Sequence, residues 1–295
     1  MLGGRVVFGL VFAAWVALGC RASEPVPDAA RRPLARDAVA VERACGPVAP
    51  VCPAAAPEPV ALESVPAWVR IREVAARPAS EIDVAEVSLQ IARARDPAVD
   101  VDANLRQLDE MTREVRRSLP PACDERCRLR ALTRHVFNVW RFRASDDPNG
   151  LYNDPDQDLL DQVLAHREGY CEGLSLLYLA LGRRLAIPLA GVLARQHMYV
   201  RYVGPGGPID LDATRQGAPP LPAARYPGCH EAEGVYGRAL DAREMVGQIV
   251  SVVGIIDELP ARRAWLDAAV EMAPRDPDLR NNRGVERERW FDLPG

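Results

Sequence analysis

The sequence contains no lysine: all 37 basic residues are arginine. With 41 acidic residues the formal net charge is −4, which gives no basic surface for nucleic acid. The longest apolar run, at residues 6–19, has 14 residues and is too short to span a bilayer as a helix. Because lysine is absent, no side-chain amine of this chain could accept an acyl group from an active site of its own.

The first 19 residues have the pattern of a bacterial lipoprotein signal peptide. Arg5 precedes the apolar run, which ends in Ala-Leu-Gly-Cys, with Cys20 as the residue that would carry the lipids. An ordinary secretory cleavage near Ala22 is the alternative. Residues 20–66 are rich in proline and alanine without a sustained apolar period, so we expect an extended tether. These features predict a membrane-anchored lipoprotein of the bacterial cell envelope, facing the periplasm or the exterior.

Export would place the other cysteines in an oxidising compartment, where disulfides persist. Two pairs are close enough in sequence to be bridged: Cys45 with Cys52, and Cys123 with Cys127 if the helix start around them is irregular. Cys229 is then left over. The spacing of cysteines and histidines fits no zinc site, so we expect no metal and no cofactor.

Helical sequence fills the region between the tether and residue 170. Asp102 is placed to cap a helix over residues 103–119, and another amphipathic helix is expected to follow it. Residues 144–157 form a polar loop of strong turn formers. His135 and His166 lie in the helical segments, and we interpret both as structural or solvent-facing.

Residues 169–188 are the stretch around which the rest of the chain is organised. Gly169 permits a tight turn, and Pro188 closes about four turns of helix-compatible sequence that follow Cys171. The helix is predicted to be buried and amphipathic, with Leu174, Leu177, Tyr178, Leu181 and Leu185 on one apolar stripe. Cys171 would lie in its first turn, where the helix dipole favours the thiolate. A free cysteine is more often a small buried hydrophobe, so a nucleophile needs a base as further support.

The base is found on the next predicted element, a strand that carries His197. A Gly-Pro-Gly-Gly turn follows, and then a second short strand with Asp210 and Asp212. If Val203 and Pro208 close the turn, His197 lies opposite Thr214 and diagonal to Asp212, within reach of an imidazole–carboxylate hydrogen bond. Cysteine at a helix start, then histidine and aspartate on adjacent strands, is typical of a nucleophile, its base and an orienting group.

This order of Cys171, helix, His197 and Asp212 resembles the core of the transglutaminase-like superfamily. Leu-Asp-Ala-Thr at 211–214 resembles the family's Val-Asp-Pro-Thr segment, so Asp212 matches the third triad residue, although Ala213 replaces the proline. The resemblance implies a papain/transglutaminase-like α+β fold without metal or cofactor. It comprises a helical N-terminal part, a nucleophile helix packed on a small antiparallel sheet and a C-terminal helical hairpin that resembles one tetratricopeptide pair.

Papain-like folds also place a glutamine six residues before the nucleophile to bind the oxyanion. That position is Ala165 here, so this donor is missing. The backbone N–H of Cys171 can supply one donor, and Gln157 or Tyr170 is the candidate for the second.

The predicted domains are a signal peptide at 1–19, a tether at 20–66, a transglutaminase-like domain at 67–235 with its core at 159–217, and a helical tail at 236–295. The predicted function is acyl transfer on amide bonds of a protein or peptide substrate, as a protease, an amidase or a transglutaminase. The alternative is a non-catalytic envelope lipoprotein that uses the same fold as a binding or scaffold module.

Overall fold

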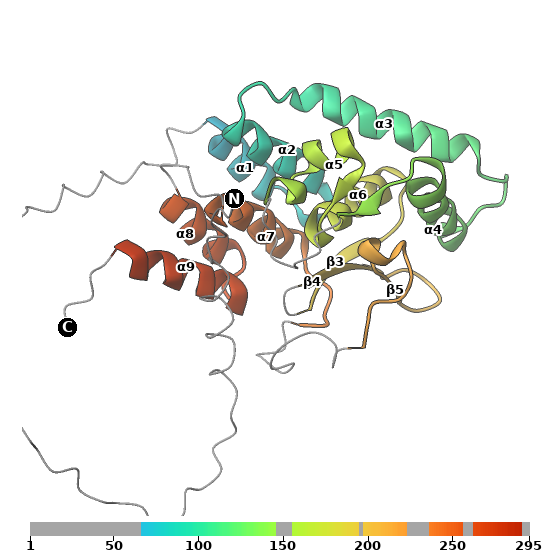
Figure 1. Cartoon of the computed structure of the whole chain (residues 1–295). Helices are drawn as coiled ribbons and strands as arrows, with labels where there is room; N and C mark the ends of the chain where they lie inside the picture. Colours follow the sequence, from blue (N-terminus) through green and yellow to red (C-terminus); the bar gives the residue numbers. More distant parts are fainter. Residues whose placement is uncertain (1–65, 146–154, 195–196, 223–235, 256–261, 291–295) are drawn as a thin grey trace, which may run out of the picture. The chain divides into compact units, whose positions relative to one another are not determined.

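The computed structural model describes residues 66–145, 155–194, 197–222, 236–255 and 262–290, all within one compact unit at 59–295. These residues combine helices with two small sheets, which confirms the α+β class (Figure 1). The predictions for Cys20, Cys45, Cys52 and Cys229 lie outside the described residues. In the described part of the chain, every helix is too short or too polar to cross a bilayer.

The N-terminal part is helical, and aspartates cap the starts of its three longer helices after α1. It contains α1 (Pro66–Ala75), the short helix η2 (Ala79–Glu81), α2 (Val84–Arg95), α3 (Val101–Arg117) and α4 (Glu125–Arg134). The cap of α3 is Asp100, whose carboxylate accepts the Ala103 N–H at 2.9 Å. The predicted cap, Asp102, is wrong because that residue lies inside the helix. Asp100 is in extended backbone with its oxygen aimed at the third N–H of the helix, as a cap requires.

Between α4 and the central helix the chain makes several short elements. They are a π-helical turn η3 (His135–Val139), β1 (Arg143–Ala144), the 3₁₀ turn η4 (Pro155–Asp158), α5 (Leu160–His166) and β2 (Glu168–Gly169). Strands β1 and β2 pair in parallel. His135 is buried with Nδ1 2.8 Å from the Ala131 carbonyl oxygen, and His166 is exposed with Nδ1 3.1 Å from that of Gln162. Both histidines therefore have the structural or solvent-facing places that we expected.

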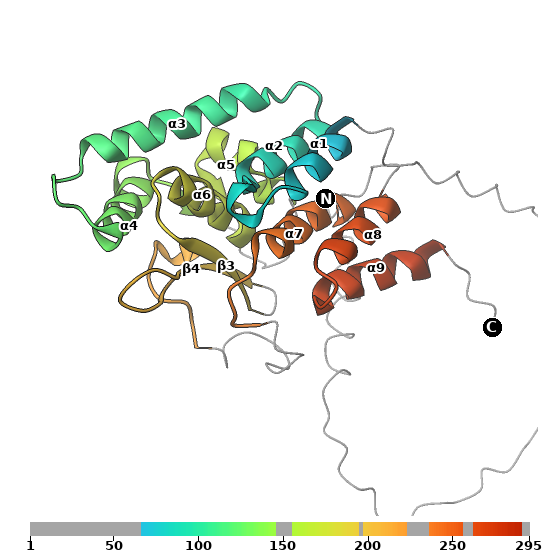
Figure 2. The same ribbon diagram turned by 180° about the vertical axis from the view of Figure 1, so that it is seen from behind.

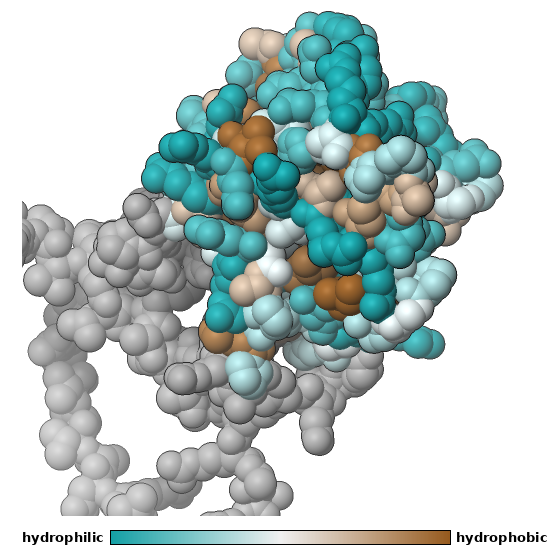
Figure 3. All heavy atoms as spheres, turned by 90° about the vertical axis from the view of Figure 1, so that its right-hand side faces the viewer, coloured by the Kyte–Doolittle hydropathy of each residue, from teal (hydrophilic) through white to brown (hydrophobic). Residues whose placement is uncertain are grey.

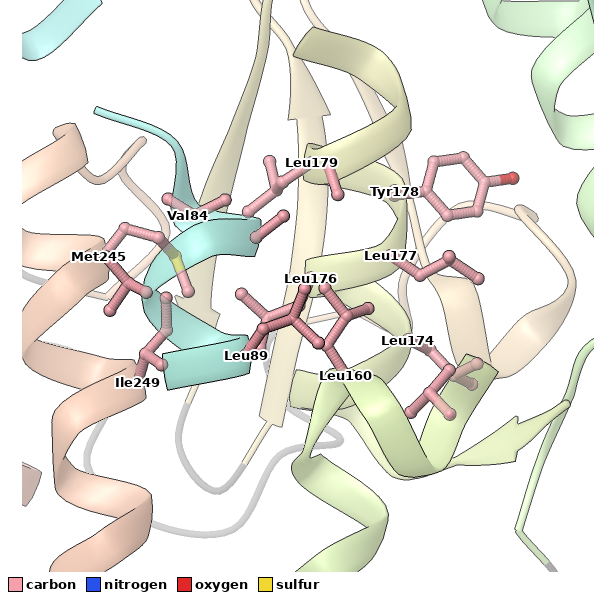
Figure 4. Close-up of a cluster of buried hydrophobic side chains, with 14 of the residues drawn as sticks. Val84, Leu89, Leu160, Leu174, Leu176, Leu177, Tyr178, Leu179, Met245 and Ile249 are labelled. Atoms are coloured by element: carbon pink, nitrogen blue, oxygen red, sulfur yellow. The ribbon is translucent and has the colours of Figure 1, made fainter. Parts of the chain in front are cut away.

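Helix α6 (Cys171–Arg184) is the centre of the core. It contacts α2, α3 and α5 as well as the sheet, and every residue from Gly173 to Gly182 is buried. Figure 4 shows Leu176 and Leu179 directed toward α2 and α7, while Leu174 and Tyr178 point away from them. The predicted amphipathic stripe is thus wrong in its extent, because the helix is enclosed on all sides and its other face is leucine and alanine rather than polar.

The larger sheet is antiparallel, with β4 (His197–Tyr202) between β3 (Leu189–Ala194) and β5 (Ile209–Leu211). Arg201 is paired with Asp210, which is the register that a turn closed by Val203 and Pro208 predicts. Strand β5 ends at Leu211, however, and a 3₁₀ turn η5 (Ala213–Arg215) follows it. Thr214 therefore does not sit opposite His197 in a ladder, as the extended hairpin predicts.

The β4–β5 turn is held by the first turn of α4. The Arg126 guanidinium donates to the carbonyl oxygens of Gly206 and Gly207, and the Tyr202 hydroxyl donates to Glu125 at 2.8 Å. A disulfide joins Cys123 to Cys127 at this helix start. Figure 3 views the side of the molecule where α4 lies; it is largely hydrophilic, with hydrophobic residues in small separate patches.

The C-terminal helices α7 (Ala242–Ile255), α8 (Arg262–Met272) and α9 (Pro277–Trp290) pack in sequence, and α7 also packs on α2 (Figures 1 and 2). Before α7, the Leu240 N–H donates to the Gly191 carbonyl oxygen at 2.9 Å, so residues beyond 235 complete one edge of the sheet. The Gln248 side chain donates to Asp276 at 2.6 Å, and both are buried. The Leu240 hydrogen bond and the packing of α7 on α2 therefore tie the tail to the core, whereas the Gln248–Asp276 contact joins α7 to the turn before α9 within the tail.

Candidate functional site

Cys171 is the first residue of α6, and a separate segment caps this end of the helix. The preceding residue, Tyr170, provides no side-chain cap, but its N–H donates to the Gln157 carbonyl oxygen at 3.1 Å. The Asp158 carboxylate accepts the N–H groups of Glu172 and Gly173, the latter at 3.3 Å. The turn η4 thus supplies the acceptors that the start of α6 lacks.

Two glycines allow η4 to come this close. A Cβ at Gly169 would lie 2.9 Å from the Gln157 carbonyl oxygen, and one at Gly173 would lie 2.5 Å from the same atom. Both distances are below any normal carbon–oxygen contact. The glycines on either side of Cys171 are therefore required by the approach of a backbone and not by a turn conformation.

His197 and Asp212 are in direct contact at the start of β4. The Nε2 atom of His197 lies 2.9 Å from Asp212 Oδ2, and the Asp212 side chain is 2% exposed. The other carboxylate oxygen accepts the N–H and the hydroxyl of Thr214 at 3.0 and 2.7 Å. Burial acts to raise the pKa of Asp212, but the hydrogen bonds from His197 and Thr214 outweigh it, so this pKa falls below its ordinary value.

Asp210, the other acid of the second strand, has a different partner. Its two carboxylate oxygens bind the Arg201 guanidinium at 2.5 and 2.8 Å. Asp212, the acid matched by the family pattern, lies just after the end of β5 and is the one in contact with His197. A bidentate arginine pair occupies the other.

Cys171 lies where the start of α6 meets the start of β4. Its thiol is hydrogen bonded by the backbone N–H of Met198, the residue that follows His197. One turn along the helix, the Ser175 hydroxyl donates to the Met198 carbonyl oxygen at 3.4 Å. The structure therefore places the start of α6, with Cys171, against the start of β4, which carries the His197–Asp212 pair.

The electrostatic surroundings of Cys171 differ from the sequence-based expectation. Burial raises the pKa of the thiol, the negative charges of Asp158, Glu172 and Asp212 raise it further, and the Met198 hydrogen bond lowers it only in part. The prediction that the helix terminus makes Cys171 a thiolate is wrong for this state of the protein. Desolvation and three nearby carboxylates outweigh the dipole.

The two residues predicted to bind the oxyanion lie beside Cys171, but their observed roles are mainly structural. Gln157 and Tyr170 share a backbone hydrogen bond, and Tyr170 is buried. The side-chain oxygen of Gln157 is buried without a hydrogen-bond partner in the described residues. Neither contact assigns an oxyanion donor, so that role stays a prediction for both.

Sequence reasoning missed Asp158 and Glu172. Glu172 is adjacent to the nucleophile, and one of its oxygens is buried without a hydrogen-bond partner among the described residues. Burial raises its pKa, and the charges of Asp158 and Asp276 raise it further. Asp158 lies at the end of a segment that reads as a polar loop, and nothing local indicates that it caps a helix thirteen positions on.

In the described chain no group of three or more histidine, cysteine or acidic side chains is arranged to hold a metal ion.

Comparison with known proteins identifies one family and several bacterial relatives. Residues 102–221 match the model of the Transglutaminase-like superfamily. A "UPF0162 protein" of Xylella fastidiosa strain Temecula1 is 24% identical over 68% of this chain and 75% of its own length. "UPF0162 protein YchA" of Escherichia coli K12 is 32% identical over 39% of this chain and 40% of its own length.

A third relative, "UPF0162 protein PA3419" of Pseudomonas aeruginosa, is 35% identical over 36% of this chain and 38% of its own length. The chain thus spans three quarters of one curated relative but about two fifths of the others. No solved structure matches. Over residues 102–221, which include Cys171, His197 and Asp212, this chain is similar to the transglutaminase-like superfamily.

Proposed function

We propose that this protein is a thiol-dependent acyl-transfer enzyme that acts on amide bonds through Cys171, His197 and Asp212. The observation that carries the proposal is the His197–Asp212 hydrogen bond of 2.9 Å beside a cysteine at a helix start. A buried carboxylate that holds a histidine ring is the usual support for a general base. The similarity to the transglutaminase-like superfamily supports the same chemistry.

The hydrogen bond assigns a role to each nitrogen of His197. If Nε2 donates its proton to Asp212, the neutral ring has its lone pair on Nδ1, which is the atom to take the thiol proton. Because the pKa of the Cys171 thiol is raised, we propose that this transfer accompanies attack and is not complete beforehand.

The proposed reaction has two halves. The Cys171 sulfur bonds to the amide carbonyl carbon while its proton moves to His197, and the Cys171 N–H binds the oxyanion, with Gln157 or Tyr170 as the second donor. The C–N bond then breaks as the imidazolium protonates the leaving amine, which yields a thioester. Water or an amine, deprotonated by His197, attacks the thioester and releases the thiol.

Hydrolysis is the expected outcome in water, so we propose a protease or amidase before a cross-linking enzyme. A transglutaminase outcome would need an amine from another molecule, because this chain has no lysine. We further propose that α8 and α9 form one tetratricopeptide-like pair that docks on α7 and does not extend into a superhelix. An envelope lipoprotein anchored through Cys20 would present this domain to protein or peptide substrates.

The test is chemical labelling and turnover in the full chain. We expect an acyl-electrophile probe to label Cys171, and we expect peptide-amide hydrolysis that is abolished by Cys171→Ala. His197→Ala should cost nearly as much, because the two residues act as a unit. Asp210→Asn is the matched control, because that carboxylate binds Arg201 instead. Equal labelling and turnover in wild type and Cys171→Ala would reject the enzyme in favour of a binding module.

A further inference from the structure

Asp158 acts on the first turn of α6, which begins at Cys171, in two ways. Its carboxylate accepts the N–H groups of the second and third residues of α6, Glu172 and Gly173. Its charge also acts on the Cys171 thiol. The first N–H of a helix, here that of Cys171, has no acceptor within the helix. The cap therefore satisfies the two N–H groups next to the one that the proposed reaction uses.

We propose that Asp158 is a positioning residue for Cys171: it fixes the first turn of α6 and holds a carboxylate beside the residue that carries the thiol. The inference rests on the proposed function, because it assigns Asp158 a task only if Cys171 is the nucleophile. A fixed first turn places the Cys171 sulfur and N–H together on one substrate carbonyl. A protonated resting thiol is protected from electrophiles until His197 takes its proton.

Contacts on two sides hold η4 in a defined position next to Cys171. The Gln157 carbonyl oxygen occupies the space that side chains of Gly169 and Gly173 would fill. The turn therefore packs against the backbone on both sides of Cys171. Asp156, in the same turn, forms an ion pair with Arg95 of α2 at 2.8 Å. The turn is thus held from behind by α2 while Asp158 faces α6.

The charged groups that act on the thiol come from three elements packed against it. They are Asp158 of η4, Glu172 of α6 and Asp212 after β5, with the Met198 N–H of β4 opposing them. Burial raises the pKa of Asp158 to about 6, although its two N–H donors act in the opposite direction. Glu172 has its pKa raised by burial first and by Asp158 second. Asp158 is therefore ionised above neutrality, where the thiol needs its protection.

Asparagine and alanine separate the two roles of Asp158. Asp158→Asn keeps an oxygen that can accept the Glu172 and Gly173 N–H groups but removes the charge. Asp158→Ala removes both. Asp156→Asn is the control, because it removes one charge from the same turn on the side facing Arg95, and the asparagine oxygen can still accept a hydrogen bond from Arg95 and keep the turn in place.

The experiment measures the iodoacetamide alkylation rate of Cys171 in the full chain against pH, followed by mass spectrometry of the Cys171 peptide. In Asp158→Asn we expect the rise of the rate profile to move to lower pH, so that the rate at pH 7.5 is about tenfold higher, because a nearby like charge has been removed. Asp156→Asn should match wild type. A purely structural cap predicts coincident profiles for wild type and Asp158→Asn, and that result would overturn the proposal.

Alkylation needs no substrate, so the two proposals fail separately. If the alkylation profile of Asp158→Asn is shifted but wild type shows no amide turnover, the proposed enzymatic function is rejected, while the effect of Asp158 on Cys171 is established. If wild type shows turnover but the profile of Asp158→Asn is not shifted, the proposed role of Asp158 is rejected, while the enzymatic function is retained. If Asp158→Ala does not fold, the asparagine variant alone decides the outcome.

Discussion

The carbonyl oxygen of Gln157 lies where a side chain of Gly173 would begin, since a Cβ on Gly173 would be only 2.5 Å from it. The Val163 side chain would be 2.8 Å from the same Cβ. A backbone oxygen cannot rotate away as a flexible side chain can. The position of η4 against the nucleophile therefore depends on the absence of one carbon atom.

Gly173→Ala should accordingly lower stability by about 1–3 kcal/mol, because overpacking outweighs the gain in helix propensity. It should also increase alkylation of Cys171, since η4 must move away from α6 and the Asp158 carboxylate moves with it. Gly284→Ala is the control: nothing lies within 4 Å of its Cβ in α9, so alanine there should be neutral or stabilising by up to about 1 kcal/mol. Urea unfolding of both variants measures the difference, and equal midpoints would contradict the packing argument.

Asp212→Asn should lower kcat/KM by a factor of about 10² to 10⁴ while the protein stays folded, because an amide favours the wrong tautomer of His197. Asp210→Asn should change kcat/KM by less than about threefold, since it weakens only a partly exposed pair with Arg201. Steady-state kinetics on one peptide amide compares the two. A larger loss in Asp210→Asn would mean that the wrong acid has been assigned to His197.

The alkylation rate of wild-type Cys171 should keep rising with pH beyond the ordinary range of a cysteine, about 8.5. The reason is that burial and three carboxylates hold the pKa of this thiol above its usual value. Iodoacetamide kinetics between pH 6 and 10 provide the measurement. A rate that is already constant below pH 7 would instead indicate a preformed thiolate–imidazolium pair.

Replacement of Asp158 should also change how stability depends on pH. The pKa of this acid is raised from 3.8 to about 6 in the folded protein, so between these values the native state holds more protons than the unfolded state. Wild type therefore loses stability as the pH rises through this window. Asp158→Asn does not titrate and should gain about 1–3 kcal/mol relative to wild type between pH 4 and 7.5. Urea unfolding at both pH values tests this, and a constant difference would refute it.

The packing of the tail helices on one another can be tested at Gln248 of α7. Its side chain donates to Asp276 at 2.6 Å, and both residues are buried. Gln248→Ala should cost about 1–3 kcal/mol, because a buried carboxylate loses its donor. Gln107→Ala, on the exposed face of α3, should change stability by less than about 0.5 kcal/mol.

The anchor remains a prediction from sequence, and it has its own test. Wild-type protein should sediment with membranes, whereas Cys20→Ser should be released or remain an unprocessed precursor, because the predicted lipid would be attached through that sulfur. Cell fractionation with mass analysis of the mature N-terminus distinguishes these results. A soluble mature protein without acyl chains would reject the lipoprotein.

The sequence predicts those parts of the site that depend on local patterns. The hairpin register follows from the Gly-Pro-Gly-Gly turn and the alternation of the strands, so the contact between His197 and Asp212 could be anticipated. The start of α6 at Cys171 follows from Gly169 and the leucine-rich run. These are short-range effects of turn geometry and hydrophobic spacing.

The parts that could not be predicted depend on contacts between distant segments. The cap of α6 comes from Asp158, and the covered outer face of α6 comes from packing by α2, α3 and α5. The raised pKa of Cys171 results from burial and from charges on three elements. A helix dipole can be read from one segment, but the desolvation that opposes it appears only once the segments are packed.

The sequence separation within the site has a consequence for folding. His197 and Asp212 are 15 residues apart in one hairpin, so their contact has a low contact order and can form as the hairpin forms. Cys171 joins them only when α6 packs against β4. Local opening between these two elements would separate the sulfur from the imidazole and leave the imidazole–carboxylate pair intact. If Cys171 is the nucleophile, as we propose, the docking equilibrium of the hairpin on α6 sets the fraction of molecules able to react at any moment.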